Sequence, residues 1–255
     1  MREILSATGR DVLARFARTP VLLAFDFDGT LAPIVRDPQR AAMRPVTRRL
    51  LARLARLYPC VVISGRGRAD VLRRVGAIAI RNVIGDHGIE ASGAPRALRR
   101  KVGRWARLLS RQLERWEGVT VEEKPYSVSV HYRNARRKPE ARAAVVRAAG
   151  NLVAVRLIGG KDVVNVLPRG AAHKGRALER ERIRRRCRTA IYVGDDETDE
   201  DVFGGGRTAR LLAIRVGVRK TSRAEYCVRS QARIDALLRA LIALRAGPEG
   251  RSPES

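Results

Sequence analysis

Three short apolar runs, each ending in polar or acidic residues, constrain the fold of this 255-residue chain most strongly. The runs cover residues 21–27, 61–63 and 190–193. Each is short enough to be a strand and apolar enough to be buried on both faces. Helical periodicity follows the first run at residues 45–57 and the second at residues 68–75. Strands that alternate with helices predict a parallel α/β sheet.

The middle of the chain has a different pattern. Residues 97–116 and 137–149 show helical periodicity, whereas residues 119–123 and 127–133 alternate like an antiparallel hairpin. A second strand pair, at 152–158 and 162–167, is expected to turn at Gly159-Gly160. We therefore interpret residues 92–168 as an inserted α/β domain.

The α/β pattern occupies the rest of the chain. The remaining expected elements are helices over 1–18, 174–185 and 230–245 and strands over 79–84 and 211–216. The expected fold class is thus α/β, with a Rossmann-like parallel-sheet core in two parts, residues 17–91 and 169–245. Residues 246–255 contain mostly Gly, Pro, Ser, Glu and Arg and are expected to form a disordered tail.

The formal net charge of +27 raises the question of a nucleic-acid partner. Only six of the 53 basic residues are lysine, the arginines are spread along the chain, and aromatic residues that stack on bases make up 4%. We therefore expect an arginine-rich solvated surface and no nucleic-acid partner. Such a surface would still attract an anionic substrate.

Cysteine content and hydropathy indicate a cytoplasmic protein. Cys60, Cys187 and Cys227 are far apart, odd in number and without a CxxC pair, which argues against a disulfide scaffold and a zinc site. The N-terminus lacks a signal-peptide apolar region, and no apolar run reaches 18 residues. The expected protein is soluble and has no membrane partner, and the sequence leaves its oligomeric state open.

Acidic residues follow two of the three apolar runs. Asp26 and Asp28 close the first, and Asp195, Asp196 and Asp199 follow the third. In open α/β sheets the carboxyl ends of the strands share one edge, where ligands bind. Clustered carboxylates repel one another unless a cation lies between them, and Mg²⁺ prefers such oxygen ligands together with phosphate oxygens. The pattern therefore predicts a magnesium site that faces a phosphate.

The Asp26-x-Asp28 spacing places two carboxylates on one side of an extended segment. One carboxylate can attack phosphorus, and the other can protonate the leaving alcohol and deprotonate water. Gly29 leaves space for backbone N–H groups to approach phosphate oxygens. Ser64 offers a small donor, and Lys174, at a helix start, offers a positive charge.

Each of these residues also has an ordinary structural explanation when taken alone. Ser64 suits a helix cap, Lys174 an exposed surface and Asp199 the first turn of a helix. The four motifs together are more specific. Their combination resembles the haloacid dehalogenase (HAD) superfamily, through 26-DFDGTL-31, 64-SGR-66, Lys174 and 194-GDDETDE-200, in that order. The resemblance implies a HAD-like core with the inserted segment as an α/β cap.

A finer resemblance is to trehalose-6-phosphate phosphatases. It is carried by 28-DGTLAP-33, 64-SGR-66, 85-GDHGIE-90, 122-EEK-124, 131-HYR-133, 173-HKG-175 and 194-GDDETDEDVF-203. It implies Asp26 as nucleophile and Asp28 as acid/base. It also implies Mg²⁺ held by the Asp26 carboxylate, the Asp28 backbone carbonyl and Asp195, with Asp196 and Asp199 in support.

The same resemblance implies a sugar site that includes the inserted domain. Glu122 and Lys124 would contact sugar hydroxyls, and Gly29, Arg66, His87, Arg133 and Asn165 complete the candidate substrate-binding set. For His87 a role in a turn and for Arg133 a solvated strand end remain open. Two positions depart from the family pattern: Asp86 stands where Asn is usual, and Asn165 where Glu is usual.

The expected function is magnesium-dependent hydrolysis of trehalose 6-phosphate through an aspartyl-phosphate. One alternative is the same chemistry on another sugar phosphate, such as glucosylglycerate phosphate or sucrose phosphate. An alternative of another class is a basic nucleic-acid-binding protein on a HAD-like scaffold. The paired carboxylates opposite a lysine favour the enzyme, because a binding protein has no use for them.

Overall fold

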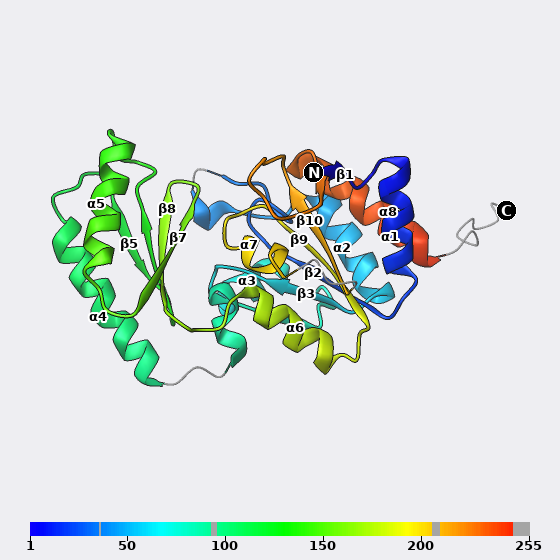
Figure 1. Cartoon of the computed structure of the whole chain (residues 1–255), viewed down its shortest axis with the longest axis horizontal. Helices are drawn as coiled ribbons and strands as arrows, with labels where there is room; N and C mark the ends of the chain where they lie inside the picture. Colours follow the sequence, from blue (N-terminus) through cyan, green and yellow to red (C-terminus); the bar gives the residue numbers. More distant parts are fainter. Residues whose placement is uncertain (36, 93–95, 206–209, 247–255) are drawn as a thin grey trace.

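The computed structural model describes residues 1–35, 37–92, 96–205 and 210–246. Figure 1 shows two lobes side by side, each with its own sheet. The large lobe contains a seven-stranded sheet in the order β1-β11-β10-β9-β2-β3-β4, and every neighbouring pair in it is parallel. Its strands are β1 (Arg2–Glu3), β2 (Val21–Phe25), β3 (Cys60–Ile63), β4 (Asn82–Ile84), β9 (Thr189–Gly194), β10 (Leu211–Val216) and β11 (Tyr226–Val228).

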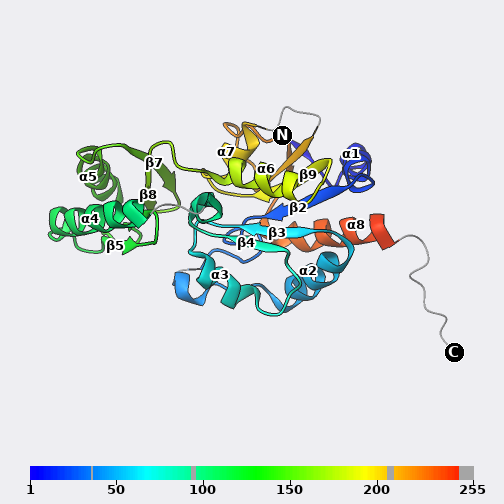
Figure 2. The ribbon, with the colours of Figure 1, turned by 90° about the horizontal axis from the view of Figure 1, so that it is seen from below.

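Helices cover both faces of this sheet. One hydrophobic cluster packs the sheet against α1 (Ala7–Ala17), α2 (Pro45–Leu57), α3 (Arg68–Val75) and α8 (Ile234–Ala246). A second cluster packs the other face against α6 (Lys174–Arg184) and the short α7 (Glu200–Phe203). In Figure 2, α6 and α7 lie on one side of β2 and β3, and α2, α3 and α8 lie on the other. Three short 3₁₀ segments, η1 (Pro38–Arg40), η2 (Asp86–Ser92) and η3 (Gln231–Arg233), complete the large lobe.

The apolar runs form strands because both of their faces are buried. In β2, Leu23 and Phe25 point into the first cluster, whereas Leu22 and Ala24 point into the second. Alternate residues of a strand point to opposite faces, so a run without polar residues suits only a central strand. β2 meets this condition, since it lies between β9 and β3.

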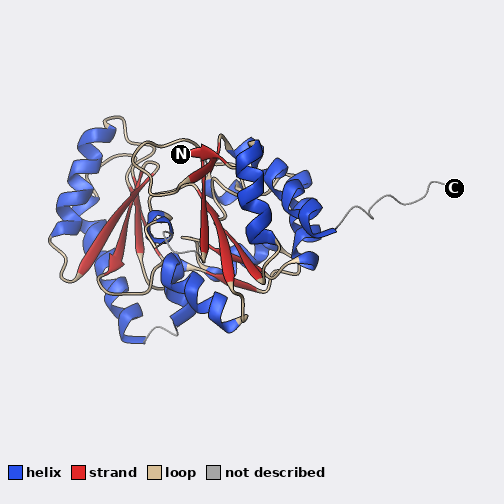
Figure 3. Ribbon diagram, turned by 45° about the vertical axis from the view of Figure 1, so that its right-hand side comes forward, coloured by secondary structure: helices blue, strands red, loops and turns tan. Residues whose placement is uncertain are grey.

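The small lobe is an antiparallel sheet covered by two helices. The sheet has the order β5-β6-β8-β7. Its elements are α4 (Arg96–Leu113), β5 (Thr120–Glu123), β6 (Val128–His131), α5 (Lys138–Gly150), β7 (Val155–Gly160) and β8 (Val163–Pro168). A separate hydrophobic cluster joins the helices to the sheet. Figure 3 shows this lobe facing one end of the large sheet.

The structure corrects several expected elements. The first helix begins at Ala7, not at residue 1, because Ser6 caps it by accepting from the Gly9 N–H, and residues 2–3 instead pair with β11. The second hairpin turns at Lys161-Asp162, where Asp162 has a left-handed φ of 59°. Gly159 and Gly160, the expected turn, lie in β7. Ala246 ends α8, and residues 247–255 of the expected tail lie outside the described residues.

Other features agree with the sequence. Cys60, Cys187 and Cys227 are all free and buried. Within the described ranges, no helix combines the length and apolar character that crossing a bilayer requires.

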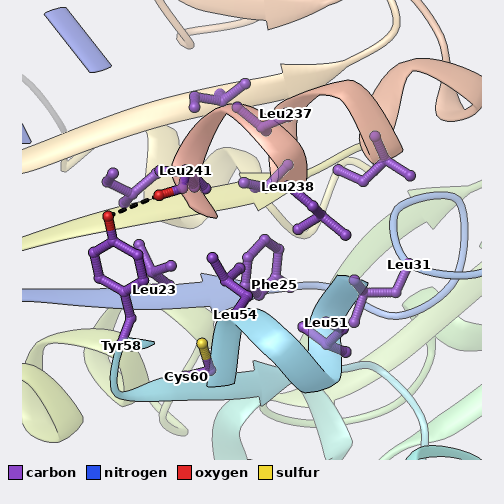
Figure 4. Close-up of a cluster of buried hydrophobic side chains, with 14 of the residues drawn as sticks. Leu23, Phe25, Leu31, Leu51, Leu54, Tyr58, Cys60, Leu237, Leu238 and Leu241 are labelled. Atoms are coloured by element: carbon purple, nitrogen blue, oxygen red, sulfur yellow. Dashed lines mark hydrogen bonds between the residues drawn. The ribbon is translucent and has the colours of Figure 1, made fainter. Parts of the chain in front are cut away.

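Packing of α2 on α8 provides a test of the large-lobe core. Figure 4 shows Leu54 of α2 among side chains of α8 and β2, and Leu54 is fully buried. Truncating it leaves a cavity, so Leu54→Ala should lower the free energy of unfolding by about 2–5 kcal/mol. Arg53→Ala, at an exposed position of the same helix, should change it by less than about 0.5 kcal/mol. Urea unfolding of the whole chain measures both, and equal effects would contradict this packing.

Candidate active site

The carboxyl ends of four neighbouring strands bring the candidate residues together. Asp26 follows β2, Ser64 follows β3, His87 lies in the segment after β4, and Asp195 follows β9. Lys174 is the first residue of α6, which packs on the same sheet. The predicted convergence on one sheet edge is therefore found in the structure.

Lys174 lies at the centre of this edge and is 1% exposed. Its Nζ is 2.7 Å from Asp199 Oδ1 and 3.2 Å from Asp26 Oδ1. Burial alone would lower the pKa of Lys174, but the negative charges of Asp199 and Asp26 outweigh burial and raise it. The ammonium group is therefore charged and is fixed between two carboxylates.

Three carboxylates form a compact cluster around this lysine. One oxygen from each of Asp26, Asp195 and Asp199 lies within 4.8 Å of the others. Burial, with the charges of Asp199 and Asp28, raises the pKa of Asp26 to about 8 against the opposing effect of Lys174. Burial, together with the charges of Asp26, Asp199 and Asp196, also raises the pKa of Asp195. One lysine does not balance this many buried acids, so the cluster favours protons or a further cation.

Asp199 and Asp196 differ from the other two acids in their hydrogen bonds. Asp199 Oδ1 accepts from Lys174 Nζ and, at 2.6 Å, from the Tyr192 hydroxyl, and its Oδ2 accepts from the Asp196 N–H at 2.8 Å. Asp196 Oδ1 accepts from the Glu197 N–H at 2.6 Å. Asp199 thus holds the Lys174 ammonium in place through a buried hydrogen bond. Sequence reasoning missed Tyr192, because an apolar strand such as 189–194 gives no sign of a hydroxyl directed at the site.

Asp195 approaches the loop after β2 very closely. Gly29 has φ +75°, and a Cβ built on it would lie 2.0 Å from Asp195 Oδ2, so only glycine fits here. Thr30 Oγ1 donates to Asp195 Oδ1 at 3.1 Å. Arg215 donates to the backbone carbonyls of Asp195 and Asp196 and pairs with Glu200 at 3.0 Å. Thr30 and Arg215 hold the acidic loop, and sequence reasoning identified neither.

The Asp28 carboxylate is held by Arg66. Arg66 donates from Nε to Asp28 Oδ2 at 2.6 Å and from Nη2 to Asp28 Oδ1 at 2.8 Å, a two-point contact. Arg66 Nη1 also donates to Asp70 at 2.9 Å. The Ser64 hydroxyl, 1% exposed as a residue, accepts from the Arg66 N–H at 3.2 Å. Arg66 is predicted to contact substrate, and that role stays a prediction beside its contact with Asp28.

His87 and Asn165 lie together where the small lobe meets the core. His87 is 5% exposed, and burial together with Lys124 and Lys174 lowers its pKa well below the usual value, so its ring is neutral. Asn165 is close enough to His87 to affect that pKa. Asn165 Oδ1 accepts from the Ser129 hydroxyl at 2.7 Å, across the β6–β8 pair. These groups offer neutral hydrogen-bonding atoms near the charged cluster.

Glu122 and Lys124 come from β5 and the turn after it. The Lys124 ammonium donates to the Gly65 carbonyl at 2.9 Å and lies 3.8 Å from Glu122. Glu122 Oε2 is 2.9 Å from His131 Nε2. Lys124 therefore reaches the loop after β3 from the small lobe. Arg133 reaches the large lobe elsewhere, donating to the Val35 carbonyl at 2.8 Å.

A family model described as trehalose-phosphatase matches residues 24–234. The chain belongs to the trehalose-phosphatase family. The trehalose-phosphate phosphatase of Mycobacterium avium (strain 104) is 40% identical over 232 residues, which cover 83% of this chain and 57% of that protein. The chain thus spans little more than half the length of the curated relatives it matches.

Solved structures show the same fold. The C-terminal domain of C. albicans trehalose-6-phosphate phosphatase superposes with a TM-score of 0.78 at 22% identity, covering 95% of this chain and 98% of that one. Aspergillus fumigatus trehalose-6-phosphate phosphatase gives a TM-score of 0.62 at 25% identity, covering 95% and 99%. The prediction of a parallel-sheet α/β core with a second α/β lobe, and of the family, is confirmed.

The pH dependence of stability tests the contact of Arg66 with Asp70. Burial alone would raise the pKa of Asp70, but hydrogen bonds from Arg74 and Arg66 outweigh it and lower the pKa from 3.8 to about 2. Because the folded pKa is the lower one, Asp70 stabilises the fold above about pH 4, and this contribution is lost as the pH falls toward 2. Asp70→Asn should therefore lower the free energy of unfolding by about 1 kcal/mol at pH 7.

The difference between Asp70→Asn and wild type should shrink between pH 4 and pH 2 in urea unfolding. Glu140→Gln, which removes the exposed pair with Arg137, should leave the pH profile unchanged. A difference that stays constant down to pH 2 would show that Arg66 and Arg74 do not lower the pKa of Asp70.

Proposed function

We propose that this chain hydrolyses trehalose 6-phosphate to trehalose and phosphate through an aspartyl-phosphate intermediate. The observation that carries the proposal is the buried contact of Lys174 with Asp26, beside Asp195, at the edge of the sheet. Family membership supports the substrate. A buried carboxylate next to a fixed ammonium group can attack phosphorus while the ammonium balances charge on the phosphate oxygens.

In this proposal Asp26 forms the covalent bond and Asp28 moves the protons. The Asp26 carboxylate attacks phosphorus as the bond to the sugar oxygen breaks, and Asp28, which enters this step protonated, gives its proton to that oxygen. Asp28 then takes a proton from the water that cleaves the aspartyl-phosphate, which releases phosphate and regenerates Asp26. Arg66 keeps the Asp28 carboxylate oriented. Ser64 and the backbone near Gly29 contact phosphate oxygens.

The residues fit a divalent cation. Asp26 Oδ1 is buried and lies 3.2 Å from Lys174 Nζ without accepting a hydrogen bond, and Asp26 belongs to the three-carboxylate cluster. Oxygen ligands of this kind suit Mg²⁺. We propose that Asp26, the Asp28 backbone carbonyl and Asp195 hold it, with Asp196 and Asp199 in support. A bound Mg²⁺ would add positive charge beside the phosphate and allow the acids to ionise.

The small lobe supplies the sugar side of the site in this proposal. We assign residues 92–168 as a cap that excludes bulk water, inserted between core segments 17–91 and 169–245. Glu122, Lys124 and Asn165 come from this segment, and neutral His87 faces it from the core. Arg133 contacts the Val35 carbonyl. Its role in binding substrate stays a prediction.

Phosphate release tests both the chemistry and the substrate. Asp26→Asn removes the attacking oxygen, so turnover of trehalose 6-phosphate with Mg²⁺ should fall by a factor on the order of 10³ or more. Asp11→Asn, at an exposed position of α1, is the matched control and should keep wild-type activity. Circular dichroism of both variants checks that the fold is retained.

A panel of sugar phosphates identifies the substrate. Trehalose 6-phosphate should give the highest kcat/KM, ahead of sucrose phosphate and glucosylglycerate phosphate. Retained activity in folded Asp26→Asn would contradict the nucleophile assignment. A higher kcat/KM for another sugar phosphate would contradict the substrate while leaving the chemistry in place.

A further inference from the structure

The small lobe is seated on the core through the turn that joins β5 to β6. The turn is closed by the Lys124 N–H, which donates to the Ser127 carbonyl at 2.9 Å. Its residues meet two core loops, the one after β3 and the one after β4. The first contact is the Lys124 ammonium on the Gly65 carbonyl.

The second contact is made by Asp86, which follows β4 and is 0% exposed. Its Oδ2 accepts from the Tyr126 N–H at 2.5 Å, and its Oδ1 accepts from the hydroxyl of Ser127, which is also fully buried. Both carboxylate oxygens of Asp86, a core residue, thus accept hydrogen bonds from the small lobe. A buried acid with two donors aimed at it is a fixed connection, because separating the lobes would leave its oxygens to find other partners.

The backbone of Asp86 is equally well anchored on the core side. The Asp86 N–H donates to the Arg66 carbonyl at 2.8 Å, and the His87 N–H donates to the Ser64 carbonyl at 3.0 Å. Asp86 has a left-handed φ of 50°, a conformation that Asp and Asn tolerate better than most residues. The loop that carries Asp86 is therefore joined to the loop that carries Ser64 and Arg66.

The ion pair that joins the lobes at Arg156 is more exposed. Arg156 of β7 pairs with Asp201 at 2.5 Å, with side chains 43% and 17% exposed. Exposed ion pairs contribute little, whereas hydrogen bonds to a buried charged group contribute more. A buried apolar contact also joins the lobes, where Ile89 packs on Ile158 and Leu167. The Asp86 contact adds fully buried hydrogen bonds beside the catalytic loops.

We propose that Asp86 is a positioning residue that latches the β5–β6 turn onto the core and thereby sets the sugar side of the active site. It acts through Tyr126 and Ser127, which fix the turn and with it Glu122 and Lys124. It does not touch the phosphate. The proposal rests on the proposed function only where it concerns the sugar, and the latch itself can be measured without catalysis.

Hydrogen–deuterium exchange measures the latch directly in the substrate-free protein. Asp86→Gly removes the carboxylate and keeps the left-handed backbone accessible, so peptides covering residues 120–131 should exchange faster than in wild type. Ser127→Ala removes one of the two bonds and should give an intermediate increase without altering the core loop. Asp86→Asn should behave like wild type, because its amide oxygen accepts from Tyr126 and its NH₂ donates to the Ser127 hydroxyl.

Kinetics on two substrates separate positioning from general damage. With trehalose 6-phosphate, Asp86→Gly should raise KM about tenfold or more, and Asp86→Asn should restore it to within about threefold of wild type. With p-nitrophenyl phosphate, which carries no sugar, kcat/KM should change less than about twofold in either variant. Arg156→Gln, at the exposed contact, is the control and should match wild type in exchange and kinetics.

Exchange and kinetics together distinguish failure of the latch, of the positioning role and of the proposed substrate. Unchanged exchange at residues 120–131 in both Asp86→Gly and Ser127→Ala would overturn the latch. Faster exchange with an unchanged KM, or equal losses on both substrates, would overturn the positioning role. If wild type fails on trehalose 6-phosphate, the proposed substrate is wrong, the exchange result stands, and the KM comparison is made on the sugar phosphate that wild type does hydrolyse.

Discussion

The contact of one buried ammonium group with two buried carboxylates organises this protein. Lys174 lies between Asp26 and Asp199, out of reach of water. Such charges are tolerated only when they are paired and hydrogen-bonded. Tyr192 and the Asp196 N–H complete the shell around Asp199. Because Asp195 is part of the same cluster, one lysine leaves an excess of negative charge, and that excess is the basis of the proposed cation site.

The parallel sheet makes this arrangement possible. The β9-β2-β3-β4 order places four strand ends in a row, so residues more than 160 positions apart in sequence, such as Asp26 and Asp195, meet at one edge. Gly29 permits the closest approach, since any side chain there would collide with the Asp195 carboxylate. At the same edge of the sheet, the loop after β4 joins the core to the small lobe, because Asp86 accepts hydrogen bonds from Tyr126 and Ser127. The sugar side and the phosphate side of the proposed site are thus both attached to the carboxyl edge of the large sheet.

The sequence predicted the strand ends well and the side-chain partners poorly. Apolar runs and the polar residues after them located Asp26, Ser64 and Asp195, because the change from apolar to polar side chains marks the end of a buried strand. It missed Tyr192, Thr30 and Arg215, whose roles depend on packing between distant segments. The contact of Arg66 with Asp28 depends on such packing too, and residues 2–3 are too few to be predicted as a strand. Asp86 was noticed as a departure, but its two small-lobe partners were visible only in three dimensions.

The most direct test of the account is the effect of Mg²⁺ on thermal unfolding, at fixed ionic strength, for wild type and Asp195→Asn. A cation that binds the acidic cluster in the folded state alone raises Tm with its concentration. The account predicts a Tm that climbs with Mg²⁺ in wild type and a much smaller rise in Asp195→Asn. A wild-type Tm that does not respond to Mg²⁺, or an equal response in the variant, would contradict the claim that these carboxylates converge to hold a cation beside Lys174.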